Sequence, residues 1–260
     1  MAIYDQLKET SASEIRKLFD MAQGMEDLIS LGIGEPDFDT PQLIKDRAKK
    51  ALDDGYTHYS PNIGREDLRE EIVKKMKKRN NVDVGLDNVM VTVGANQAFL
   101  MSLSTFVQDG DEVLIPSPGF VSYGPSVKFA GAKPVEYPLR YKNNFRPTIE
   151  DLEERTTEKT KAIILNSPNN PTGTILKKED LEEIADYLVE NDIVAITDEI
   201  YEDIIYEDEH VSLASLNGIS DRVITVNGFS KNFAMTGWRL GYVVAPEETI
   251  DLMVRFQMYN

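Results

Sequence analysis

A lysine that follows a strand-like run is the residue of this 260-residue chain whose position most strongly suggests chemistry. Lys231 comes after the apolar run Val223 to Val226, and Arg239 follows eight residues later. A lysine amine can form an imine with an aldehyde, and an arginine can grip a phosphate through two parallel hydrogen bonds. Most lysines are only solvated surface groups, so this pair needs support from the rest of the sequence.

Three further polar features each follow a different apolar run. They are Asp198, Asn170 and the turn Gly94-Ala95-Asn96. A buried carboxylate is costly unless a cation pairs with it, and free amides at a helix N-terminus bind phosphate. Each feature also has a plain interpretation, because aspartate caps helices and Asn, Pro and Gly build ordinary turns.

Seven short apolar runs of strand length alternate with helix-length amphipathic segments. The runs are Val89 to Val93, Glu112 to Ile115, Lys133 to Tyr137, Ala162 to Leu165, Ile193 to Thr197, Val223 to Val226 and Leu240 to Val244. This alternation predicts an α/β fold with a mixed, mostly parallel seven-stranded sheet flanked by helices. Ligands of open sheets bind beyond the carboxyl ends of the strands, which is where the polar features fall.

Helical periodicity is clearest from Glu66 onward and again from Leu181 to Leu188. Nearer the N-terminus, the pattern predicts a short helix at Ser13 to Met21 and a strand-like piece at Leu28 to Ile33. The following Gly34-Glu-Pro-Asp-Phe-Asp-Thr-Pro41 reads as a loop. We expect Pro41 in the first turn of the next helix, with Thr40 as its cap.

The composition argues against several classes of protein. A formal net charge of −17 opposes nucleic-acid binding, and no run has the length of a membrane span. Cysteine is absent and the only histidines are His58 and His210, so we expect no metal centre. The N-terminus lacks the apolar core of a signal peptide. We therefore expect a cytoplasmic enzyme or binding domain that has neither nucleic acid nor membrane as a partner.

Several segments, in order along the chain, closely resemble the fold-type-I pyridoxal-phosphate enzymes of the class I/II, aspartate aminotransferase family. The matching segments are Gly34 to Pro41, Thr57 to Gly64, Gly94 to Phe99, Pro116 to Tyr123, Asn166 to Gly173, Ile196 to Tyr201 and Asn227 to Tyr242. The joint match extends over the chain from about Ser11 to its end and is far more specific than any single segment.

The resemblance implies pyridoxal 5'-phosphate as the cofactor, joined to Lys231 through an imine. The implied catalytic residues are Lys231, Asp198 on the pyridine nitrogen, and Tyr201, which would donate to the ring oxygen beside Asn170. The implied phosphate ligands are Ala95, Asn96, Ser230, Arg239 and, from the neighbouring subunit, Tyr59. Phe120 would stack on the ring, and Gly34 with Asn170 would contact the substrate. Gly228 departs from the family, since many members carry serine there.

The resemblance further implies amino-group transfer between an L-amino acid and a 2-oxo acid in a homodimer with a shared active site. Aspartate is the first expected substrate, and aromatic amino acids and alanine remain open. Residues 1–40 would belong to the small domain, and 41–260 would form the large cofactor-binding domain, ending in the interdomain helix that starts near Glu247. Family members continue past Asn260 and carry there the arginine that binds the substrate carboxylate, so we expect a C-terminally truncated chain.

Three alternatives remain from the residues and the resemblance. One is another pyridoxal-phosphate enzyme of the same fold, of the lyase or cyclopropane-carboxylate synthase type. Another is an inactive fragment without the substrate-carboxylate arginine. The third is the effector domain of a transcription regulator, which the acidic composition disfavours.

Overall fold

The structure, a computed structural model, describes residues 21, 32, 34–216 and 218–259. Apart from Met21 and Gly32, the helix predicted at Ser13 to Met21 and the strand-like piece predicted at Leu28 to Ile33 lie outside the described residues. The prediction that residues 1–40 belong to a small domain therefore stays a prediction.

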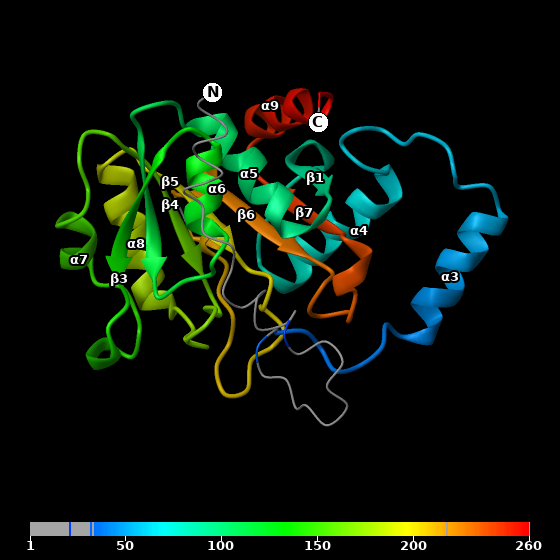
Figure 1. The fold of residues 1–260 in the computed structure, drawn as a ribbon, viewed down its shortest axis with the longest axis horizontal. Helices are drawn as coiled ribbons and strands as arrows, with labels where there is room; N and C mark the ends of the chain where they lie inside the picture. The colour runs from blue at the N-terminus through cyan, green and yellow to red at the C-terminus, as the bar shows by residue number, and fades with distance from the viewer. Residues whose placement is uncertain (1–20, 22–31, 33, 217, 260) are drawn as a thin grey trace.

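The central layer is a seven-stranded sheet with the order β1-β7-β6-β5-β4-β2-β3 (Figure 1). Strand β7 runs antiparallel to both of its neighbours, and all other neighbouring strands are parallel. The predicted mixed, mostly parallel sheet is confirmed, and each of the seven predicted runs is a strand. The strands are β1 (Val89–Thr92), β2 (Glu112–Ser117), β3 (Lys133–Pro138), β4 (Thr160–Asn166), β5 (Val194–Asp198), β6 (Val223–Gly228) and β7 (Gly241–Val244).

Helices cover both faces of the sheet because the strands present apolar side chains to each side in alternation. Ile164 and Ile196 face one core, whereas Ile163 and Ala195 face the other. The first core is closed by α5 (Gly94–Phe106), α6 (Tyr123–Phe129) and α9 (Glu247–Gln257); the second is closed by α7 (Ile149–Glu153) and α8 (Lys178–Glu190). Helix α5 begins at Gly94, so the turn Gly94-Ala95-Asn96 singled out in the sequence is its first turn.

Helix α4 (Glu66–Arg79), which the periodicity from Glu66 predicts, packs on the β1 and β7 end of the sheet. Ile72 and Met76 are buried against side chains of both strands. Acidic residues in its first turn and basic residues in its last turn suit the helix dipole. The 3-10 turns are η1 (Leu86–Asn88), η2 (Tyr141–Asn143), η3 (Leu213–Ser215), η4 (Ser220–Arg222) and η5 (Thr236–Trp238).

Helix α3 (Gln42–Asp53) stands away from the rest of the fold, as Figure 1 shows, and none of its residues is buried. The prediction that Thr40 caps this helix is wrong. Pro41 occupies the N-cap position without a side-chain cap, because the Thr40 hydroxyl donates instead to the carbonyl of Ala234. No helix within the described part of the chain is long and apolar enough to cross a membrane.

Candidate active site

The predicted site residues gather where parallel strands end at one edge of the sheet. Strands β1 and β6 are both antiparallel to β7 and are therefore parallel to each other, so their carboxyl ends share an edge with those of β2, β4 and β5. The connections that leave this edge carry the α5 N-terminus, Phe120, Asn170, Asp198 and Lys231. The topology thus brings together residues that are far apart in the sequence.

Asp198 is the last residue of β5 and is only 4% exposed. The Tyr123 hydroxyl donates to its Oδ2 at 2.6 Å, and the Ile200 amide donates to its Oδ1 at 3.2 Å. Burial raises the pKa of Asp198 to about 6, despite these two hydrogen bonds. No described side chain forms an ion pair with Asp198. The carboxylate is therefore suited to a cationic ligand.

Tyr123 was not among the predicted site residues, although it lies in the segment that contains Phe120. Its buried ring makes edge-to-face contacts with Phe120, at 5.6 Å between centroids, and with Phe99. A fully buried tyrosine hydroxyl needs a hydrogen-bond partner, and that requirement is the sequence signal that could have pointed to Asp198. Phe120 itself is half-buried at the margin of the core, beside the site.

Tyr201, Asn170 and Lys231 lie together beside Asp198. The Asn170 side-chain amide donates to the Tyr201 hydroxyl at 3.4 Å, and the Lys231 Nζ is 5.5 Å from the centroid of the Tyr201 ring. Burial and the Asp198 charge raise the pKa of Tyr201, whereas the bond from Asn170 opposes that rise. The phenol is therefore a hydrogen-bond donor at neutral pH.

Lys231 occupies the turn after β6 and contacts the N-terminal loop. Its ammonium donates to the carbonyl of Gly34. Burial lowers the pKa of Lys231, while the carboxylates of Glu35 and Asp198 act in the opposite direction. A lysine with a lowered pKa supplies the neutral amine that attacks a carbonyl carbon.

Two side chains outside the predicted set hold this arrangement in place. Asn166, at the end of β4, donates to the Asp198 carbonyl at 3.0 Å and accepts the Asn170 amide at 2.7 Å. Asp203 accepts from Asn232, next to Lys231, at 2.6 Å and also pairs with Arg79 of α4. Asn166 thereby fixes the loop after β4 to β5, and Asp203 fixes the turn after β6 to α4.

The N-terminus of α5 and Arg239 form the part of the site suited to an anion. Gly94 has φ +74°, and a Cβ there would lie 2.8 Å from Arg239 Nη2. The guanidinium therefore lies directly beside the first turn of the helix, where Ala95 and Asn96 carry free amides. Helix N-terminal amides with an adjacent arginine fit the phosphate of pyridoxal phosphate. Ser230, half-buried, directly precedes Lys231.

The backbone around Gly228, where the resemblance implies a serine in many family members, leaves little room for a side chain. It is the last residue of β6 and pairs with Gly241 of β7. A Cβ at Gly228 would lie 3.0 Å from the Leu240 carbonyl oxygen and 3.2 Å from Ile200 Cδ1. A serine would require the adjoining strand to shift, so no phosphate hydroxyl is available at this position.

Tyr59 is the one predicted ligand that the structure does not bring to the others. It lies in the loop between α3 and α4, and its side chain is fully exposed. Its predicted contact with a neighbouring subunit involves a chain that is not present, so that contact stays a prediction.

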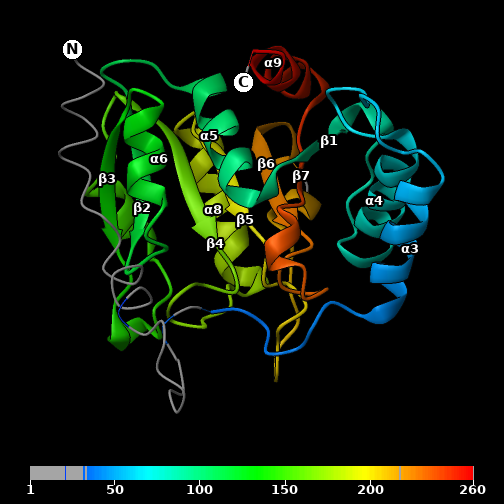
Figure 2. The same ribbon diagram turned by 45° about the vertical axis from the view of Figure 1, so that its right-hand side comes forward.

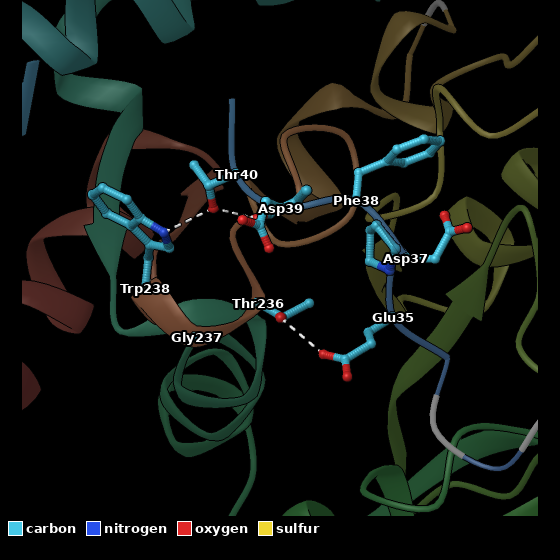
Figure 3. A pocket seen from close by; sticks show the side chains of 10 residues that line it. Glu35, Asp37, Phe38, Asp39, Thr40, Thr236, Gly237 and Trp238 are labelled. Carbon is cyan, nitrogen blue, oxygen red and sulfur yellow. Dashed lines mark hydrogen bonds between the residues drawn. The ribbon is translucent and has the colours of Figure 1, made fainter. Parts of the chain in front are cut away.

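A hollow of about 810 Å³ opens between the loop before α3 and the turn that precedes β7 (Figure 3). Its walls are the loop from Glu35 to Thr40 and the turn from Ala234 to Trp238. Figure 3 shows the two walls joined, since the Trp238 indole donates to Thr40 at 3.0 Å and Thr236 donates to Glu35 at 3.1 Å. The hollow does not include Lys231 or Asp198, but Gly34 links its first wall to the lysine.

Comparison with known proteins shows the family of the chain. The family model "Aminotransferase class I and II" matches residues 26–259. An aspartate aminotransferase of Pyrococcus abyssi is 62% identical over 100% of this chain and 67% of its own length. An aromatic-amino-acid aminotransferase of Thermococcus litoralis is 58% identical, also over 100% of this chain and 67% of its own length. The crystal structure of a Pyrococcus protein, protein-A1, has a TM-score of 0.95 at 60% identity, over 99% of this chain and 67% of that one.

The fold and the lysine site define a cofactor-dependent transferase. The chain belongs to the class I and II aminotransferase family and is a pyridoxal-phosphate-dependent aminotransferase. The resemblance drawn from the motifs is confirmed, and the lyase and cyclopropane-carboxylate synthase alternatives are not favoured. The chain spans about two-thirds of the length of these relatives.

Proposed function

We propose that this protein transfers the amino group of an L-amino acid, aspartate first, to a 2-oxo acid at the site around Lys231. The observation that carries the proposal is the convergence of Asp198, buried without an ion pair among the described residues, with Lys231 and an anion site at Arg239. When bound, pyridoxal phosphate supplies an aldehyde that reacts with amines and a ring that withdraws electrons from the carbon bearing the amino group.

In this proposal the chain's own groups bind and orient. The Asp198 carboxylate, held in place by Tyr123, would keep a proton on the ring nitrogen. Tyr201 and Asn170 would donate to the ring oxygen, and Phe120 would pack on the ring. Ala95, Asn96, Ser230 and Arg239 bind the phosphate.

Lys231 has two functions in the proposal. Its neutral amine would hold the cofactor by condensing with the aldehyde, with loss of water. When a substrate amine takes its place, the free Nζ would be the group that accepts the proton of the substrate α-carbon and gives it back. A pKa lowered by burial suits a group that must both accept and return a proton.

The proposed assembly is a homodimer with a shared active site. Two observations support it: Tyr59 is fully exposed although a phosphate ligand is expected at this position, and α3 buries none of its residues. In a dimer, the arm from α3 to Tyr59 would reach the neighbouring site. We further propose a cytoplasmic enzyme, which the absence of cysteine supports.

The preferred amino acid is the finer part of the proposal. Aspartate is supported by the 62% identical relative named aspartate aminotransferase. Aromatic amino acids form a second candidate class, because the 58% identical relative carries that name and because Trp238 and Phe38 line the hollow. Glu35, Asp37 and Asp39 line it too, and their carboxylates oppose the side-chain charge of aspartate.

The test is a comparison of kcat/KM for aspartate and phenylalanine, with 2-oxoglutarate as the common acceptor. The proposal predicts a 2-oxo acid product from at least one donor and a higher value for aspartate. A higher value for phenylalanine would transfer the assignment to the aromatic class. Release of ammonia without a new amino acid would contradict amino-group transfer altogether.

A further inference from the structure

A second buried polar cluster lies directly behind the segment that carries Asp198 and Tyr201. Glu199 directly follows Asp198, Glu202 directly follows Tyr201, and both glutamates are buried. Where strands end, neighbouring residues point to opposite sides, so Glu199 points away from the cofactor side and toward the face that α4 covers. None of the roles proposed above uses this cluster.

The cluster pairs two basic side chains with two carboxylates. The His210 Nε2 lies 3.0 Å from Glu199 Oε2, and Lys75 of α4 pairs with Glu202. The Asn80 side-chain amide bridges the two acids, at 2.7 Å from Glu202 Oε2 and 3.5 Å from Glu199 Oε2. With His210 protonated, the cluster has no net charge.

The remaining hydrogen bonds tie Glu199 to the strands. Its Oε1 accepts from Ser212 at 2.8 Å and from Thr197 at 3.3 Å. The Tyr242 ring of β7 lies 5.8 Å from Lys75 Nζ, and burial with the two glutamates raises its pKa well above the ordinary value. Tyr242 therefore stays neutral. Arg79 and Asp203, at the edge of the cluster, neutralise each other.

The charges, rather than hydrogen bonds, decide the protonation of His210. Its Nδ1 is buried and has no partner among the described residues, so either tautomer leaves that atom unpaired. A neutral ring would leave two buried carboxylates against one ammonium, directly behind Asp198. Burial lowers the pKa of His210, but Glu199 and Glu202 outweigh it and raise the pKa above the ordinary value.

We propose that His210 is a positioning residue that, as a cation on Glu199, holds the Asp198–Tyr201 segment and screens Asp198 from a buried negative charge. The charge of Glu199 raises the pKa of Asp198, so an unscreened Glu199 would weaken the anion on which the cofactor's ring nitrogen depends. This effect on the cofactor rests on the proposed function; the charge balance of the cluster does not.

The first measurement is an NMR titration of the histidine rings in the cofactor-free protein. His210 is assigned by comparison with His210→Gln, because the chain has only one other histidine. We expect its midpoint above about 6.5, the ordinary value of histidine. A midpoint at or below that value would overturn the cationic role. Protonated His210 therefore contributes fully to the stability of the folded state below about pH 6.5, and this contribution is lost as pH rises through the folded-state midpoint.

The second measurement is a double-variant comparison, with cofactor affinity from equilibrium dialysis and thermal midpoints of the cofactor-free form. His210→Gln should weaken pyridoxal phosphate binding about tenfold, the equivalent of one pKa unit on Asp198. Glu199→Gln/His210→Gln, which removes both charges, should restore most of that affinity. Lys77→Gln is the control, because Lys77 lies on α4 like Lys75 of the cluster but makes an exposed ion pair, with Asp83.

If Glu199→Gln lowers cofactor affinity further in the double variant instead of restoring it, the charge-balance account is overturned. A lower thermal midpoint for His210→Gln with unchanged cofactor affinity would show structural support only and would overturn the positioning role. Stabilisation of the parent by added Mn²⁺ or Zn²⁺, absent in His210→Gln, would mean that Glu199, Glu202 and His210 form a metal site instead. Failure of the proposed function appears separately, as a parent protein that forms no adduct on Lys231.

Discussion

Asp198 illustrates how a single residue can favour function at the expense of stability. It is buried with hydrogen-bond donors but with no cation from the described chain, and its pKa is raised to about 6 from 3.8. Between these two values the folded state binds a proton more tightly than the unfolded state does. The stability of the cofactor-free protein therefore falls as pH rises through that window.

Replacing Asp198 by asparagine should consequently stabilise the cofactor-free protein. At about pH 8 we expect a gain of roughly 1–3 kcal/mol in unfolding free energy, since a pKa shift of one unit is worth about 1.4 kcal/mol. At about pH 4 the gain should vanish. Urea unfolding at both pH values measures the effect.

The same variant should bind pyridoxal phosphate far more weakly, because an amide cannot pair with the protonated ring nitrogen. Equilibrium dialysis of parent and variant at about pH 8 measures that loss. A variant that is less stable than the parent at this pH, or that retains the parent's affinity, would contradict the reading of Asp198 as a destabilising functional carboxylate.

At the scale of elements, the approach of β6 to β7 limits which side chains the site can use. Gly228 and Gly241 face each other in these strands, and β7 lies against the first turn of α5. A Cβ at Gly241 would meet the backbone of Gly94 and Ala95 at 2.8 to 3.0 Å. Small residues at this junction let the phosphate-binding helix sit close to the sheet.

Gly228→Ser, which restores the residue common in the family, should therefore destabilise the protein by about 1–3 kcal/mol, a typical cost of overpacking. It should not improve cofactor affinity, because the strand must shift to admit the side chain. Gly85→Ser is a suitable control, since a Cβ there meets only Asn88 Oδ1 at an ordinary 3.7 Å. Tighter cofactor binding with unchanged stability would show that the hydroxyl fits after all.

At the scale of the whole molecule, α3 and the loop that leads to Tyr59 are largely exposed in an isolated chain. The helix buries no residue, and Figures 1 and 2 show it at the outer edge of the molecule. Apolar side chains such as Leu43 and Leu52 are more than half exposed there. In the proposed homodimer, the second copy of the chain would cover these side chains and receive Tyr59.

Mixing two defective variants tests this shared site. Tyr59→Phe and Lys231→Ala should each have low activity at limiting cofactor. Co-refolded in equal amounts, they should recover about a quarter of the parent's activity, because half of the dimers are hybrids and each hybrid has one intact site. Each variant refolded alone is the control. A mixture no more active than the mean of the two controls would place Tyr59 outside the partner's site.

The sequence predicts the sheet almost completely, because strands that are buried on both faces must be apolar runs and turn residues separate one run from the next. It also predicts site residues at or just after the ends of strands, such as Asp198 at the end of β5 and Asn170 in the loop after β4. It misses Tyr123, Asn166 and the His210 cluster, because their roles depend on contacts between distant segments. Thr40 fails as a predicted cap for the same reason: a tertiary contact with Ala234 replaces the local one.

The central claim is that Lys231 is the residue that bonds the cofactor. The most direct measurement adds pyridoxal phosphate to the purified protein, reduces the mixture with borohydride and maps the modified peptide. We expect one lysyl adduct, on Lys231, preceded by a visible absorption band; Lys231→Ala should show neither, whereas the exposed-lysine control Lys78→Ala should show both. An adduct on another lysine, or none in a folded protein, would contradict the account.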